Sequence, residues 1–112
     1  MTDVRHFRFF ALLTLDPPAQ DEPLRQYASG SHDLMVHCSR LDEPAVRQLF
    51  PASIYPDDEQ PLKPGDSGVL VTIDVVGDDA CAFLGPGQHI ALWNGHDCGR
   101  GVISRREVAI WG

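Results

Sequence analysis

The stretch of residues 65–104 constrains the fold most, because it alternates short apolar runs with glycine-containing turns. Residues 69–76 read VLVTIDVV, and their β-branched side chains recur at every second position. Two further runs, residues 88–93 and 98–103, follow in the same stretch. Side chains at alternate positions share one face of a strand, so the stretch predicts an antiparallel all-β domain.

Residues 5–15 predict the first strand, because their apolar side chains also recur with a period of two. The opposite face of this strand is polar at Arg8 and apolar at Phe10 and Leu12. We therefore expect the second half of the strand to be covered on both faces. Further strands are predicted at residues 33–39, 52–55 and 107–111.

Residues 41–50, LDEPAVRQLF, have a different pattern. Asp42 can cap a helix, Pro44 suits a first helical turn, and the apolar residues that follow recur at helical spacing. The pattern predicts one or two helical turns inside an insertion that covers about residues 40–60. We expect this short helical insertion to interrupt an otherwise all-β chain.

Length and charge limit the classes of protein to consider. A chain of 112 residues fits one domain, residues 1–112, because two halves would each bury too little surface. The net charge is −7, so the chain repels phosphate and nucleic acid is disfavoured as a partner. No apolar run approaches the roughly 20 residues that cross a bilayer, and no secretion signal is evident. We expect no membrane partner and a cytoplasmic protein.

The three cysteines, Cys38, Cys81 and Cys98, are an odd number without C-x-x-C spacing. This argues against a disulfide framework and a zinc knuckle, and predicts reduced thiols. His96, Asp97 and Cys98 carry the imidazole and thiol of a small metal or thiol enzyme, which is one alternative. Such turns are more often structural, so we expect no metal, no cofactor and no catalytic residue.

The order and spacing of the motifs resemble those of the C-terminal β-barrel of elongation factor Tu and related translational GTPases. The resemblance rests on three motifs. Pro64-Gly65-Asp66 precedes a β-branched strand, and Ile90-Ala91-Leu92 matches the Phe-Ala-Ile motif of the family. Gly99-Arg100-Gly101-Val102-Ile103 matches the G-x-G-V-V motif at the end of the family barrel. It spans about residues 5–104. The resemblance implies a closed six-stranded antiparallel barrel in which residues 41–50 are inserted.

The resemblance also implies a function without catalysis. In that family the GTPase chemistry lies in a separate domain, and this chain has no G-x-x-x-x-G-K-[ST] phosphate loop. The family barrel docks on the GTPase domain and helps to hold the T-stem of aminoacyl-tRNA. Here Asp33 replaces a Gln, Trp93 and Asn94 replace an Arg-Glu pair, and His96 replaces an Arg. An acid in place of an amide would repel a phosphate.

We predict a binding surface on the barrel that consists of Asp33, Trp93, Asn94, His96, Arg100, Arg105 and Arg106. Trp93 is either an exposed anchor or packed under the insertion. The arginines either form a basic patch or pair with the abundant carboxylates. The leading prediction is a stand-alone module that binds a protein, such as a GTPase or a translation component. The alternative is a barrel that binds tRNA through the arginine edge.

Overall fold

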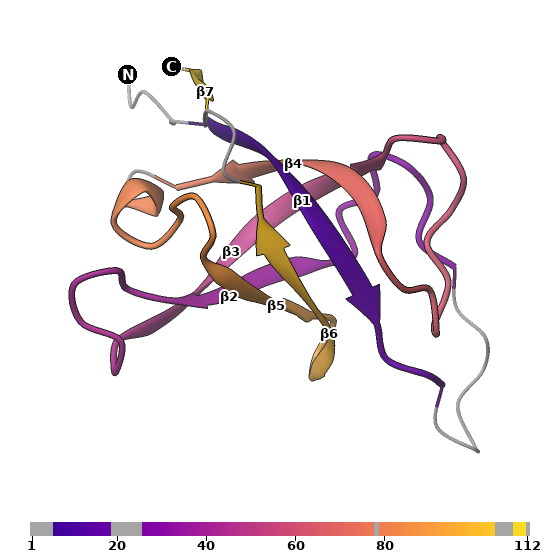
Figure 1. Ribbon diagram of the computed structural model, residues 1–112, viewed down its shortest axis with the longest axis horizontal. Helices are drawn as coiled ribbons and strands as arrows, with labels where there is room; N and C mark the ends of the chain where they lie inside the picture. Colours follow the sequence, from indigo (N-terminus) through magenta and orange to yellow (C-terminus); the bar gives the residue numbers. More distant parts are fainter. Residues whose placement is uncertain (1–5, 19–25, 78, 105–108, 112) are drawn as a thin grey trace.

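The computed structural model describes residues 6–18, 26–77, 79–104 and 109–111. It is all-β, as Figure 1 shows. The strands are β1 (His6–Leu15), β2 (Met35–Ser39), β3 (Arg47–Pro56), β4 (Val69–Val76), β5 (His89–Trp93), β6 (Asp97–Ile103) and β7 (Ala109–Trp111). One 3-10 turn, η1 (Ala80–Ala82), is present among these residues, and no described helix has the length and hydropathy of a membrane span.

Six strands close into an antiparallel barrel. Their order is β4-β3-β2-β5-β6-β1, and β1 returns to pair with β4. The short β7 lies beside the first residues of β1, where His6 is opposite Trp111 (Figure 1). The all-β class and the closed six-stranded barrel predicted from the sequence are thereby confirmed.

The strands are strongly staggered, as closure of a barrel requires. The stagger is found by moving from each residue to its direct partner on the next strand, once around the barrel. For this purpose the pairing register of β3 with β4 is continued by one residue, and that of β2 with β5 by two residues. From Asp57 the successive partners are Leu70, Leu12, Val102, His89, Ser39 and Arg47. The path thus returns to β3 ten residues before its start, at Arg47 instead of Asp57. A line of direct neighbours therefore winds obliquely around the outer wall.

The core is filled by every second side chain of the strands. On β1 the inward residues are at most 2% exposed: Phe7, Phe9, Ala11, Leu13 and Leu15. Val71, Ile73 and Val75 of β4 are fully buried opposite them. Burial of this apolar surface is the main stabilising contribution, and it confirms the period of two that the sequence predicts for these strands.

The outer face of β1 differs from its prediction. Phe10 is 40% and Leu12 is 53% exposed, so the described part of the chain leaves them uncovered. The expectation that both faces are covered was wrong, because the barrel wall is a single layer. A second layer within the same domain therefore does not explain why the outer face of β1 is apolar.

The predicted helix at residues 41–50 is absent, and this prediction was wrong. The backbone N–H of Arg40 donates to the carbonyl of Val46 at 2.8 Å, which closes a hairpin between β2 and β3. Strand β3 then begins at Arg47, well before the strand predicted from residue 52. The reason is the burial of Phe50, Ala52 and Ile54 on one strand face, a period of two that outweighs the weaker helical signals.

Candidate functional site

A continuous set of exposed apolar side chains lies on the outer wall across β4, β1 and β6. Leu12 of β1 is directly opposite Leu70 of β4 and Val102 of β6. We call Leu70, Leu12 and Val102 the apolar row; they are 45%, 53% and 39% exposed. Directly opposite residues on neighbouring strands have Cβ atoms about 5 Å apart, so the three side chains form one surface. Phe10 extends it along β1.

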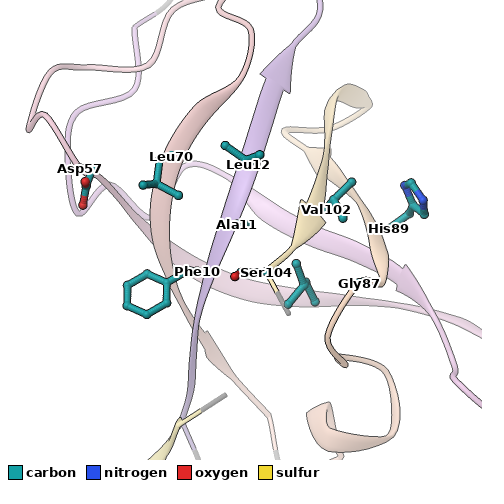
Figure 2. A pocket seen from close by; sticks show the side chains of 10 residues that line it. Phe10, Ala11, Leu12, Asp57, Leu70, Gly87, His89, Val102 and Ser104 are labelled. Atoms are coloured by element: carbon teal, nitrogen blue, oxygen red, sulfur yellow. The ribbon is translucent and has the colours of Figure 1, made fainter. Parts of the chain in front are cut away.

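The apolar row forms the floor of a hollow of about 590 Å³. Figure 2 shows Phe10, Leu12, Leu70 and Val102 gathered there, with Asp57 at one margin and His89 at the other. Small-molecule sites enclose most of their ligand, whereas these floor residues are about half exposed. The shape therefore suits the protruding surface of a macromolecule better than a small enclosed ligand.

Polar groups mark the two ends of the hollow. The backbone N–H of Asp57 donates to the carbonyl of Leu70 at 2.9 Å, which fixes the acidic residue beside the row. At the other end, His89 of β5 is directly opposite Val102. Scattered exposed leucines are ordinary, but a contiguous apolar patch with a polar rim is typical of an interaction site.

Sequence reasoning did not identify this surface as the site. Its signal is present in the apolar outward positions of β1, at Phe10 and Leu12. Leu70 and Val102 lie far apart in the sequence, and only the register of β1 with β4 and β6 places them beside Leu12. That register is set by long-range pairing that a single sequence does not specify.

None of the predicted site residues that the structure describes lines the hollow: Asp33, Trp93, Asn94, His96 and Arg100 lie elsewhere on the barrel. Trp93 is the last residue of β5, and Asn94 and His96 lie in the turn between β5 and β6. The Asn94 side-chain amide donates to the Tyr27 hydroxyl at 2.6 Å, and Tyr27 is only 4% exposed. Asn94 therefore ties the hairpin to the segment around Tyr27, which is a structural role.

Trp93 is half-buried on the outer wall. Its ring meets that of His37 on β2 edge to face, with centroids 5.9 Å apart and planes at 71°. Trp93 is thus neither a fully exposed anchor nor a fully covered side chain. Aromatic pairs of this geometry add about 1 kcal/mol of stabilisation. The ring contact accounts for Trp93 without invoking a partner.

The charged candidates are exposed. The Arg100 Nη1 atom is 3.7 Å from the Asp16 Oδ1 atom, and both side chains are more than half exposed. This ion pair agrees with the alternative that arginines pair with carboxylates, although exposed pairs contribute at most about 1 kcal/mol. Asp33 is exposed before β2. Arg105 and Arg106 lie outside the described residues.

The surroundings of Cys38 do not favour a reactive thiolate. Cys38 is 1% exposed, and burial raises the pKa of its thiol to about 11, against a smaller lowering by Arg47. A thiol is a nucleophile only when it is deprotonated, so Cys38 is inert at neutral pH. Cys98 is half-buried, and neither Cys98 nor Cys38 forms a disulfide. Among the described residues no group of three or more His, Cys, Asp or Glu side chains could hold a metal.

The Cys38 thiol predicts an alkaline effect on stability. Its pKa is about 11 in the folded protein against an ordinary 9.0, so the folded state keeps a proton that the unfolded state loses. The resulting stabilisation is complete below pH 9 and is lost as the pH rises through 11. Relative to Cys38→Ala, the wild type should lose about 2 kcal/mol between pH 8 and 10.5.

Urea denaturation of both proteins at these two pH values measures this difference. The Cys38→Ala variant serves as the control for the other groups that titrate in the same range, since both chains contain them. A difference in unfolding free energy between the two proteins that stays constant with pH would contradict the raised pKa.

The fold and the surface together define a closed antiparallel β-barrel with an exposed apolar hollow on its wall. Comparison of the chain with known protein families, with curated proteins and with solved structures gave no significant match. A proposal for the function therefore rests on the geometry and chemistry of the barrel wall and on the motif resemblance.

Proposed function

We propose that this protein is a non-catalytic β-barrel binding module that docks a protein partner on the apolar row. The observation that carries the proposal is the direct adjacency of Leu70, Leu12 and Val102, all 39–53% exposed, in one hollow. Covering the exposed half of each side chain contributes roughly 1 kcal/mol. Three such side chains and Phe10 can form the apolar centre of an interface.

Charge supports a protein partner over a nucleic acid. The net charge of −7 and the acidic Asp57 at the margin of the hollow both repel phosphate. Arg100, the described member of the predicted arginine edge, already lies beside Asp16. A tRNA-binding barrel is therefore the weaker alternative.

The motif resemblance to the elongation factor Tu barrel supports a GTPase or another translation component as the partner. The family barrel is itself a docking domain without GTPase chemistry, which agrees with the missing phosphate loop in this chain. The odd number of cysteines and the missing C-x-x-C spacing support a reducing compartment, and we place the protein in the cytoplasm.

Quantitative affinity capture from lysate with the wild type and with Leu12→Gln tests the proposal. Leu12 is the most exposed residue of the apolar row, so an amide there should reduce recovery of the specific partner by at least about tenfold. The matched control is Val46→Gln, which makes the same change from an apolar side chain to an amide at a residue that is 38% exposed and outside the hollow. Recovery with this control should equal that of the wild type.

Two outcomes would contradict the proposal. Equal recovery of every captured protein by Leu12→Gln and wild type would remove the apolar row as the docking site. Loss of the partner with Trp93→Ala alone would move the site to the ring contact between Trp93 and His37. Capture of tRNA that weakens steeply with salt would instead favour the RNA alternative.

A further inference from the structure

A second hollow of about 420 Å³ adjoins the first, and His89 lines both. It lies between β5, β2 and the hairpin that joins β2 to β3. Its other lining residues include Arg40, Leu41, Pro44, Arg47 and Gln88. The apolar row is therefore continued on one side by a hollow with two arginines.

The opposite end of the apolar row is acidic. Asp57 lines the first hollow, and Asp58 and Glu59 follow it in the β3–β4 connection. All three side chains are exposed, and within residues 6–18, 26–77, 79–104 and 109–111 no cationic group pairs with them. Their charge is available to a partner.

The basic end has the same property. Arg47 is exposed and has no carboxylate partner within the described ranges, whereas Arg40 is bound to Asp42 at 2.8 Å. The surface thus has an order along the oblique line of strands: carboxylates, then the apolar row, then His89 and Arg47. A surface with this polarity distinguishes the two directions in which a segment can lie on it.

We infer that the apolar row takes a polarised protein segment, with a basic side chain against Asp57 and Asp58 and an acidic side chain toward Arg47. The inference rests on the proposed function and adds the chemistry and direction of the partner. Neighbouring strands are about 4.8 Å apart, so the six steps from Asp57 to Arg47 cover about 29 Å along the wall. About nine extended residues or about nineteen helical residues span that length.

The complementarity of charge selects this occupant over a second copy of the chain. Each copy carries a net charge of −7, so association of two copies is opposed by mutual repulsion. Two hollows placed face to face would also leave space between them. A protruding segment with a central group of apolar side chains fills the hollow and satisfies both ends.

Selection from a library of random 16-residue peptides displayed on phage tests this inference, with the immobilised wild type as the target and Leu12→Gln for counter-selection. The enriched peptides should carry Lys or Arg at one end, apolar residues in the middle, and Asp or Glu at the other end. Charge reversal by Asp57→Lys with Asp58→Lys should slow association of a synthetic enriched peptide about fivefold at low salt. A peptide with its terminal charges exchanged should then bind this variant better than the wild type.

The control for net charge is Asp16→Lys with Asp79→Lys, two exposed carboxylates outside both hollows. This variant should leave the rate within about twofold. Failure to enrich any peptide whose binding depends on Leu12 would overturn the proposed function. Enriched peptides that depend on Leu12 but show no charge asymmetry, or do not respond to reversal at Asp57 and Asp58, would overturn this inference and leave the docking function in place.

Discussion

Replacing Phe9 by alanine should lower the free energy of unfolding by about 3–5 kcal/mol. Phe9 is 1% exposed and points into the barrel from β1, the strand that pairs with β4, β6 and β7. Removing its ring leaves a cavity that the closed wall cannot collapse into, because the neighbouring barrel strands β4 and β6 are each held by hydrogen bonds on both sides. Urea denaturation followed by circular dichroism measures the loss.

The adjacent residue supplies the matched control. Phe10 has the same side chain but is 40% exposed on the outer face, so Phe10→Ala should cost less than about 1 kcal/mol. The same substitution should weaken binding of the partner, since Phe10 lines the hollow. Equal losses of stability in the two variants would show that the faces of β1 are not divided into core and outer wall.

Gly101→Val should destabilise the barrel by about 3 kcal/mol through overpacking. A Cβ atom at Gly101 would lie 2.5 Å from the Leu13 Cδ2 atom and 2.9 Å from the Leu12 carbonyl oxygen. The side chain of Leu13 can shift, but the backbone of β1 cannot move away without breaking its ladder with β4 or β6. The measurement is again the free energy of unfolding in urea.

Arg100→Val is the control for this substitution. It places the same β-branched side chain on the neighbouring residue of β6, where the position faces solvent and is 73% exposed. Its effect should stay within about 0.5 kcal/mol of the wild type. A Gly101→Val protein as stable as this control would mean that β1 and β6 approach less closely at Gly101 than the structure indicates.

Much of the fold could be predicted from the sequence, because burial on one strand face produces a local pattern. Val71, Ile73 and Val75 show this pattern in β4, and β-branched residues favour strands independently of their neighbours. The glycines of β6 could likewise be interpreted as a close approach of another backbone. An added Cβ at Gly99 would be 2.7 Å from the carbonyl oxygen of Thr14 on β1.

The helix predicted at residues 41–50 shows where local signals fail. Asp42 and Pro44 have the properties of a helix start, yet they are equally suited to a tight connection between two strands. The decision depends on Phe50, which packs edge to face on Phe83 with ring centroids 5.2 Å apart. That contact joins residues 33 positions apart in the sequence, and no window of ten residues contains it.

The candidate site was harder to predict than the fold. Trp93 and His96 draw attention through their residue types, but the apolar surface on the barrel wall consists of ordinary leucines, a valine and a phenylalanine. These residues come from β1, β4 and β6, and their adjacency follows from the stagger of the closed barrel. These four outward residues form one surface only because strand pairing places them side by side.

The return of β1 to β4 has a consequence for the behaviour of the protein in concentrated solution. An open sheet with exposed leucines combines an edge of unpaired backbone N–H and C=O groups with apolar side chains. This combination promotes the formation of cross-β fibrils. Here each of the six barrel strands has a paired neighbour on both sides, and among the described strands the only edge belongs to β7, which is three residues long. The closed barrel can therefore expose an apolar surface without promoting the growth of fibrils.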